Sequence, residues 1–112
     1  MGKTMKMLNK NRDFQRVYAK GKSSVSRIFV AYVLKFKGNE NLIGITTSKK
    51  IGNAVKRNRA RRVIKESYRQ LEPSLSKGYV IVVVARGKTP FVKSWEVFSE
   101  MRRHFRKLGL LK

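Results

Sequence analysis

The sequence predicts a single α+β domain in which helices pack against one β-sheet. The apolar run Tyr79–Ala85 is typical of a buried strand. In the stretch Ser48–Leu71, the residues after Gly52 have the spacing of a long helix with one apolar and one cationic side. Hydrophobic residues make up 41% of the 112 residues, enough for one modest core. We therefore expect one domain over residues 11–112, preceded by a flexible basic arm over residues 1–10. Its predicted order is α-β-β-β-α-β-α, in which the first strand is short.

The first helix is expected over residues 12–20. Asn11 can cap its N-terminus, and Gly21 follows it as a stop signal. Asp13 lies in the first turn, where the helix dipole favours an anion. The apolar positions of this helix, spaced i, i+3 and i+4, are Phe14, Val17 and Tyr18.

Along the sequence, strands are expected both before and after the central helix. Residues 23–26 can form an edge strand, and Arg27–Phe36 is rich in β-branched and aromatic residues. Because Arg27–Phe36 is apolar on both faces, it should be covered on both sides. The turn-forming residues 37–41 separate it from Leu42–Ser48, with which it is expected to form a hairpin. Tyr79–Ala85 is expected to lie parallel to Leu42–Ser48.

Two further helices complete the predicted domain. Projected at about 100° per residue, the central helix is apolar on one side and polar or cationic on the other. The apolar side carries Ala60, Val63, Ile64, Ser67, Tyr68 and Leu71. The last helix should begin with Ser94 as its N-cap and end before Gly109. Its predicted buried stripe consists of Val97, Phe98, Met101, Phe105 and Leu108.

The formal net charge of +22 is the dominant feature of the composition. Such a charge opposes compaction and predicts a polyanionic partner, with nucleic acid first and an anionic membrane surface second. The longest apolar run, Tyr79–Ala85, falls far short of the ~20 residues that span a bilayer. No secretory signal is visible, so the protein is expected to be cytoplasmic. The absence of cysteine excludes disulfides and thiolate metal sites.

The groups needed for protein-borne hydrolysis are missing. A two-metal site needs several carboxylates around ions roughly 4 Å apart, whereas the acids here are scattered over caps, turns and solvent faces. These acids are Asp13, Glu40, Glu66, Glu72, Glu96 and Glu100. His104, the only histidine, has no obvious acidic partner and is expected at the surface or facing a phosphate. Gly87–Thr89 imitates the end of a phosphate-binding loop but precedes Pro90, so it is expected to be a turn.

Two cationic features point to RNA. Arginines on the polar side of the central helix can each hold a phosphate with two hydrogen bonds. At the junction Ser48–Asn53, backbone N–H groups of a helix start lie beside lysines and can form an anion site. A solvated charged face and an ordinary connection are the alternatives. The candidate RNA-binding residues are Lys49, Lys50, Lys56, Arg57, Asn58, Arg59, Arg61, Arg62, Lys65 and Arg69.

A set of aromatic side chains is the third feature that points to RNA. Phe14 and Tyr18 of the first helix can lie above Val30 and Tyr32 of the long strand. Bases of single strands that stack on exposed rings gain about 1–3 kcal/mol each. Taken singly, each ring is more often part of a core. The sequence leaves open whether these four residues form a groove or a sealed core.

The run Lys49–Arg62, K-K-I-G-N-A-V-K-R-N-R-A-R-R, resembles the signature of the bacterial ribonuclease P protein family. The resemblance extends to N-R-D-F-Q-R-V-Y-A-K-G-K-S and R-I-F-V-A-Y upstream and to Y-V-I-V-V-V-A-R downstream, and covers most of residues 9–90. It implies an α-β sandwich with a mostly antiparallel four-stranded sheet. It also implies a left-handed β-α-β crossover, whereas general rules favour a right-handed one.

The resemblance further implies a function and two RNA partners. Together with ribonuclease P RNA, the family protein removes the 5′ leader of precursor tRNA, and the RNA performs the hydrolysis with Mg²⁺. The protein is then a non-catalytic subunit of an endonuclease, without a cofactor of its own or an obligate protein partner. By the motif match, Lys49, Lys50, Arg57, Asn58, Arg59 and Arg62 face the RNA subunit, and Phe14, Tyr18, Val30 and Tyr32 line a cleft for the leader. A general RNA-structuring or ribosomal protein and a protein-only nuclease remain as alternatives.

Overall fold

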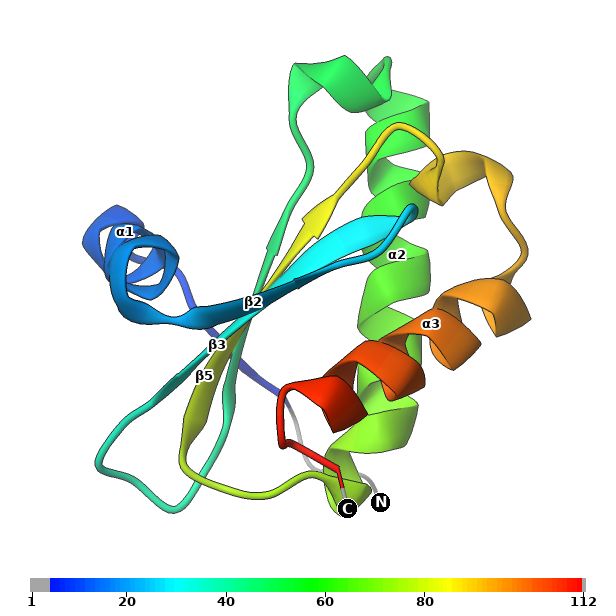
Figure 1. The fold of residues 1–112 in the computed structure, drawn as a ribbon. Helices are drawn as coiled ribbons and strands as arrows, with labels where there is room; N and C mark the ends of the chain where they lie inside the picture. Colours follow the sequence, from blue (N-terminus) through cyan, green and yellow to red (C-terminus); the bar gives the residue numbers. More distant parts are fainter. Residues whose placement is uncertain (1–4, 112) are drawn as a thin grey trace.

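The fold is a five-stranded β-sheet with α1 on one face and α2 and α3 on the other (Figure 1). The computed structural model describes residues 5–111. Its strands are β1 (Lys6–Met7), β2 (Lys22–Val25), β3 (Phe29–Lys35), β4 (Leu42–Thr46) and β5 (Tyr79–Ala85). Its helices are α1 (Asn11–Lys20), α2 (Ala54–Leu71) and α3 (Ser94–Lys107), with 3₁₀ turns η1 (Lys49–Ile51), η2 (Glu72–Ser74) and η3 (Thr89–Phe91). No helix within the described range is long and apolar enough to cross a bilayer.

The sheet is mixed and has five strands, which corrects the expected mostly antiparallel sheet of four. The strand order is β1-β4-β5-β3-β2. β3 runs antiparallel to β2 and β5, whereas β4 runs parallel to β5 and β1. The predicted hairpin of β3 with β4 does not form, because β5 lies between them. This central place buries both faces of β5 and pairs both of its edges, as its uninterrupted apolar sequence requires.

The crossover from β4 through α2 to β5 is left-handed, as the family resemblance implied. In Figure 1, β2 forms the near edge of the sheet, so β4 lies behind β5. Both strands run upward, and α2 lies to their right. From β4 through α2 to β5, the chain therefore turns clockwise while it moves toward the viewer, which is a left-handed turn. This connection leaves the N-terminus of α2 beside the carboxyl end of β4.

Part of the predicted N-terminal arm belongs to the sheet. Residues 1–4 of that arm lie outside the described residues. β1 pairs in parallel with the start of β4, and the Leu8 amide donates to the Ile43 carbonyl oxygen at 2.8 Å. Leu8 is buried and joins the core beneath α1. The prediction missed β1 because two residues are too few to show an alternating pattern.

The larger core lies between the sheet and the helices α2 and α3. Alternate residues of β3 point to this side and are buried, namely Phe29, Ala31 and Val33. The predicted apolar side of α2 is confirmed: Val63 is half-buried, and the buried positions are Ala60, Ile64, Ser67, Tyr68 and Leu71. The Tyr68 hydroxyl donates to Glu72 at 3.0 Å, and its ring meets Phe105 of α3 edge to face. Burial, together with the Glu72 carboxylate, raises the pKa of Tyr68.

The core on the α1 side is smaller, because a helix of 10 residues covers only part of this face. The buried hydrophobic cluster described here consists of Leu8, Val17, Val80 and Val82. Around it, several apolar side chains are only half-buried, among them Phe14, Tyr18, Tyr32 and Val84. Part of this sheet face therefore stays open beside α1.

Helix positions match the predictions, but two predicted caps are wrong. α1 begins at Asn11 and α3 at Ser94, so Lys10 and Lys93 occupy the cap positions. Neither lysine makes a side-chain capping bond. Each helix starts one residue earlier than the capping pattern suggested, which makes the polar residue part of the helix.

His104 is buried at 2% exposure, which corrects its predicted place at the surface. Its Nδ1 lies 2.5 Å from the Ser24 hydroxyl oxygen of β2, and its Nε2 lies 3.5 Å from a Glu100 carboxylate oxygen. Helical spacing places His104 in the buried stripe beside Met101 and Phe105. Both ring nitrogens have polar neighbours, so a histidine can occupy this position despite its polarity.

Acidification should weaken the fold through His104. Burial, and then the nearby Arg103 and Lys107, lower the pKa of His104 below its usual 6.5, although Glu100 opposes this shift. The unfolded chain therefore binds the proton first, so the stability from neutral His104 is present above pH 6.5 and is lost as the pH falls through the folded-state pKa. We expect the free energy of unfolding, measured in urea between pH 7.5 and 5, to fall by at most about 1.4 kcal/mol per pH unit.

The His104→Gln variant is the control for this titration. It should lose the decline between pH 6.5 and 5, because glutamine does not titrate. Hydrogen bonds from Ser26 and Arg103 lower the pKa of Glu100 below 4.5 in spite of its burial, so that carboxylate titrates at a lower pH. A wild-type decline in the His104→Gln variant would contradict the assignment.

Candidate nucleic-acid interface

α1 and β3 bring the four predicted cleft residues together. The ring centroids of Phe14 and Tyr18, one helical turn apart on α1, are 6.5 Å apart. The Tyr18 ring meets the Tyr32 ring of β3 edge to face at 5.0 Å. Val30 precedes Tyr32 by two residues and so points to the same face of the sheet. All four side chains are half-buried, which means that they line an open groove rather than a sealed core.

Gly44 of β4 forms the floor beneath the Phe14 ring. A Cβ atom at position 44 would lie 2.6 Å from Cε1 and 2.7 Å from Cζ of Phe14. These distances are too short for carbon atoms, so the ring requires bare backbone at this point. Glycine inside a strand often marks such a close approach. Gly44 therefore sets how deeply Phe14 lies against the sheet.

Polar side chains surround a hollow beside these rings. The hollow has a volume of about 400 Å³ and is lined by Asn9, Asn11, Phe14, Gln15, Tyr18 and Thr46. Burial raises the pKa of Tyr18, although a hydrogen bond with Thr46 opposes this shift. The Tyr18 hydroxyl thus stays protonated at neutral pH. We call this site, with Val30 and Tyr32 beside it, the aromatic hollow.

Sequence reasoning missed the polar lining of the aromatic hollow. Asn11, Gln15 and Tyr18 are spaced i, i+4 and i+7, so they share one face of α1. Thr46 and Gly44 are two residues apart in β4, so they lie on the same face of the strand. These two periodicities are the signals that would have identified the lining.

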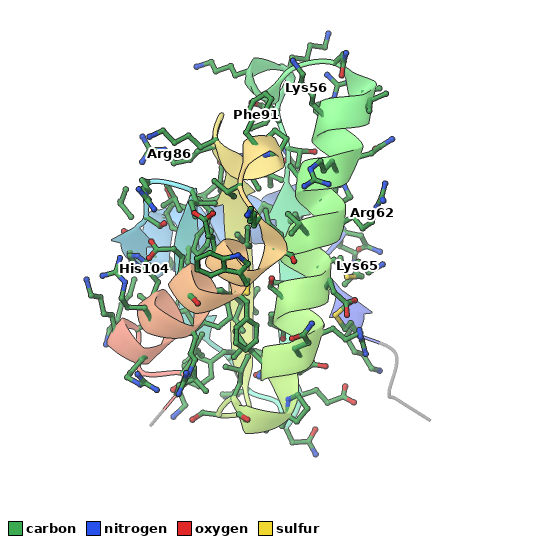
Figure 2. The ribbon with its side chains drawn as sticks, turned by 90° about the vertical axis from the view of Figure 1, so that its right-hand side faces the viewer. Lys56, Arg62, Lys65, Arg86, Phe91 and His104 are labelled. Carbon is green, nitrogen blue, oxygen red and sulfur yellow. The ribbon has the colours of Figure 1, made fainter. Side chains whose placement is uncertain are left out.

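The outer face of α2 is a row of exposed polar and cationic side chains. It includes Asn58, Arg62, Lys65 and Arg69. In Figure 2, Arg62 and Lys65 project from the same side of the helix. Arg69 pairs with Glu66, and its hydrogen bond lowers the pKa of the Glu66 carboxyl. Within residues 5–111, Arg62 and Lys65 have no hydrogen-bonding or ion-pair partner, so both can bind an external anion.

Two arginines near the start of α2 make single bonds to the protein. Arg57 Nη1 donates to the Gly52 carbonyl oxygen at 3.4 Å. Arg59 Nε donates to the Pro90 carbonyl oxygen of η3 at 2.7 Å. A guanidinium has five N–H donors, so each side chain keeps donors for a further ligand.

Arg61 connects α2, the basic helix, to β4, the strand that borders the aromatic hollow. Its Nη1 donates to the Ile45 carbonyl oxygen at 3.0 Å, and its Nη2 donates to the Thr47 hydroxyl at 3.1 Å. Thr46 lies between these two residues and lines the hollow. The carboxyl end of β4 is therefore a wall shared by the aromatic hollow and the basic helix.

The predicted junction between β4 and α2 contains η1 and two exposed lysines, Lys49 and Lys50. The Ser48 hydroxyl accepts from the Lys50 amide at 3.3 Å. Gly52 has a φ of 139°, a conformation that favours glycine. Asn53 caps α2 by accepting from the Lys56 amide at 3.0 Å. The Lys50 and Lys56 amides are thus bonded within the protein, and the junction offers the two lysine ammonium groups beside the start of α2.

The acidic side chains do not converge on one site. Within residues 5–111, no group of three or more histidine, aspartate or glutamate side chains could hold a metal ion. Glu40 pairs with Lys6 at 3.4 Å, and Glu96 pairs with Arg27 at 3.9 Å. The glutamates that accept hydrogen bonds from neighbouring side chains are Glu66, Glu72 and Glu100.

The segment Gly87–Thr89 is a turn with a structural role, as predicted. Thr89 is buried, and its hydroxyl donates to the Ile28 carbonyl oxygen at 2.6 Å. The same hydroxyl accepts from the Arg86 amide at 3.1 Å. It is thus engaged by the fold rather than presented to a phosphate.

The family model described as Ribonuclease P matches residues 2–109 of this sequence. The chain belongs to the ribonuclease P protein family. The resemblance predicted from Lys49–Arg62 is thereby confirmed. Curated members of the family carry the name "Ribonuclease P protein component", the protein part of an endonuclease ribonucleoprotein.

Two curated relatives illustrate the similarity. The chain is 38% identical over 104 residues to the ribonuclease P protein component of Clostridium botulinum (strain Langeland / NCTC 10281 / Type F), which covers 92% of this chain and 94% of the relative. It is 46% identical over 82 residues to that of Clostridioides difficile (strain 630), which covers 72% of each chain.

Solved structures of ribonuclease P proteins share the fold. The Staphylococcus aureus protein has a TM-score of 0.86 and 30% identity, and the match covers 97% of this chain and 100% of that one. The Thermotoga maritima protein has a TM-score of 0.78 and 29% identity, and the match covers 88% and 93%. The mixed sheet with three helices is therefore the ribonuclease P protein fold.

Proposed function

We propose that the chain is the protein subunit that binds ribonuclease P RNA and the 5′ leader of precursor tRNA. In this role it supports the Mg²⁺-dependent removal of the leader and so the formation of the mature 5′ end. The observation that carries the proposal is the shared end of β4: Thr46 lines the aromatic hollow, and Arg61 of the basic helix bonds both of its neighbours. Two RNA segments bound to these surfaces would lie side by side.

The aromatic hollow is the proposed site of the leader. Leader nucleotides are single-stranded, so their bases are free to stack on the rings of Phe14, Tyr18 and Tyr32. The amide groups of Asn11 and Gln15 can both donate to and accept from base edges, which suits leaders of different sequence. Mature tRNA has no leader and makes none of these contacts. The hollow therefore favours the precursor over the product.

The outer face of α2 and the lysines of η1 are the proposed site of ribonuclease P RNA. Arg62 and Lys65 offer cationic groups without internal partners. Arginine suits this role because its planar fork binds a phosphate with two parallel hydrogen bonds. The net charge of +22 also screens the phosphate repulsion between the RNA subunit and the precursor.

The hydrolytic step belongs to the RNA in this proposal. Over residues 5–111, the side-chain carboxylates are dispersed and mostly paired, which does not fit a magnesium site. His104 is buried against β2 on the face of the sheet opposite the aromatic hollow, so it cannot act on a leader bound there. Mg²⁺ is then held by the RNA, and the protein contributes binding, screening and alignment of the leader.

Cleavage of precursor tRNA at low Mg²⁺ tests the proposal. With a ribonuclease P RNA, the added protein should restore cleavage at a Mg²⁺ concentration at which the RNA alone is inactive. The protein without RNA should be inactive. Failure to restore cleavage would favour a general RNA-structuring protein. Cleavage without RNA would favour a protein-only nuclease, and either result would refute the proposal.

A further inference from the structure

A second aromatic surface lies on the side of the sheet opposite the aromatic hollow. Phe91 at the end of η3 is 68% exposed, and Trp95 in the first turn of α3 is 62% exposed. Neither ring belongs to either of the hydrophobic clusters described above. Figure 2 shows Phe91 beside Lys56, near the start of α2. The fold does not use these rings for its core, although exposing them to water is unfavourable.

Contacts with α2 hold the exposed Phe91 in place. The Lys56 ammonium lies 5.2 Å from the centroid of the Phe91 ring, within the range of a cation–π interaction. Arg59 bonds the Pro90 carbonyl oxygen, and the Thr89 and Pro90 side chains are buried beneath the turn. Phe91 is therefore an exposed ring on a fixed support, which lowers the entropy cost of stacking a ligand on it.

A cationic hollow lies beside these rings. It has a volume of about 430 Å³ between α2 and the start of α3, and is lined by Arg59, Arg62, Val63, Glu66 and Ser94. Glu66, the acid in this set, is paired with Arg69. Trp95 follows Ser94 directly in the first turn of α3. Room for a nucleotide, cations for its phosphates and exposed rings for its base thus occur together.

We propose that this surface, the η3 site, binds unpaired nucleotides of RNA through Phe91, Trp95 and the cations Lys56, Arg59 and Arg62. A base stacks on an exposed ring while its phosphates bind the ammonium and guanidinium groups. Paired bases cannot stack on these rings, because the faces of bases in a duplex are covered by the neighbouring bases. The identification of this RNA as a loop or bulge of ribonuclease P RNA rests on the proposed function.

Charge and position select this occupant. A second copy of the chain would bring two bodies of charge +22 together, which electrostatic repulsion opposes. Leader nucleotides that stack in the aromatic hollow lie on the opposite face of the sheet from Phe91 and Trp95, so they do not stack on these rings. A segment of the RNA subunit can reach the η3 site because Arg59 and Arg62 belong to the same helix that is proposed to bind it.

Trp95 is the only tryptophan, so its fluorescence reports on the η3 site directly. A short oligoadenylate RNA should quench this emission in the full-length protein. In the background of Tyr32→Ala, which weakens stacking in the aromatic hollow, Phe91→Ala should weaken oligoadenylate binding at least about fivefold, measured by anisotropy of labelled RNA, whereas Phe91→Tyr should retain the affinity of that background. The control Val25→Ala removes an exposed side chain from β2 and should change nothing. The hollow variant Tyr32→Ala should keep the Trp95 quenching.

Three results would overturn the η3 site: unchanged Trp95 emission at saturating oligoadenylate, equal affinity with and without Phe91→Ala in the Tyr32→Ala background, or a wild-type dimer in sedimentation that Phe91→Ala dissociates. The last would assign the surface to self-association. The cleavage assay separates this inference from the proposed function. Restored cleavage with an unaffected Phe91→Ala variant removes only the η3 site. Quenching without restored cleavage removes only the proposed function.

Discussion

Replacing both Phe14 and Tyr32 with alanine should weaken the binding of precursor tRNA at least ~30-fold and leave that of mature tRNA nearly unchanged. Each stacked base contributes about 1–3 kcal/mol, and two rings are removed. Both rings are half-buried, and the buried residues Val17 of α1 and Val82 of β5 still pack in the same core. Affinities of labelled precursor and mature tRNA for the protein bound to ribonuclease P RNA measure the selectivity. Equal losses for the two ligands would contradict the leader site.

Gly44→Ala is the matched variant, because it keeps both rings and moves one of them. The added Cβ would lie 2.6 Å from Phe14, so the ring must leave its place against β4. A loss confined to precursor tRNA, smaller than that of the double variant, is expected. Phe36→Ala removes a half-buried ring that follows β3 at its other end and should not change the selectivity.

The sequence predicted that β5 is buried and runs parallel to β4, but not that β5 lies between β3 and β4. Alternation along β3 and the apolar run of β5 are local properties, so they can be read from neighbouring residues. The position of β5 between β3 and β4 depends on a crossover through α2, which no local pattern encodes. Proximity in sequence favoured a hairpin of β3 and β4, and the need to bury both faces of β5 outweighed it.

The candidate site shows the same division. Helical spacing identified the cationic side of α2, and β3 alternation placed Val30 and Tyr32 on one face. The contact of His104 with Ser24 was missed because Ser24 is 80 residues away in the sequence, whereas its neighbour Glu100, four residues earlier on α3, was a local signal that was overlooked. The hydrogen bonds of Arg61 to β4 were also missed. The sequence of a helix does not show whether a cationic side chain on it binds an RNA or a backbone carbonyl of the same protein.

Replacing Arg57, Arg59 and Arg62 with alanine together should weaken the binding of ribonuclease P RNA on the order of 100-fold. Hydrogen bonds to charged groups are worth about 1.5–3 kcal/mol each, and part of this is lost to solvent screening at an exposed surface. Each lost phosphate contact should also reduce the slope of log affinity against log salt by about 0.7–0.9, so the slope should fall by about 2–3. Binding titrations at several salt concentrations measure both quantities.

Arg61→Ala provides the contrast that separates RNA binding from folding. Arg61 donates to the Ile45 carbonyl oxygen and to the Thr47 hydroxyl, so its loss should destabilise the fold by about 1–3 kcal/mol in urea unfolding. Arg62→Ala should leave stability unchanged, because Arg62 has no internal partner within residues 5–111. A triple variant with an unchanged salt slope would mean that this face of α2 does not meet phosphates. Loss of stability with Arg62→Ala would mean that its side chain serves the fold instead of an RNA ligand.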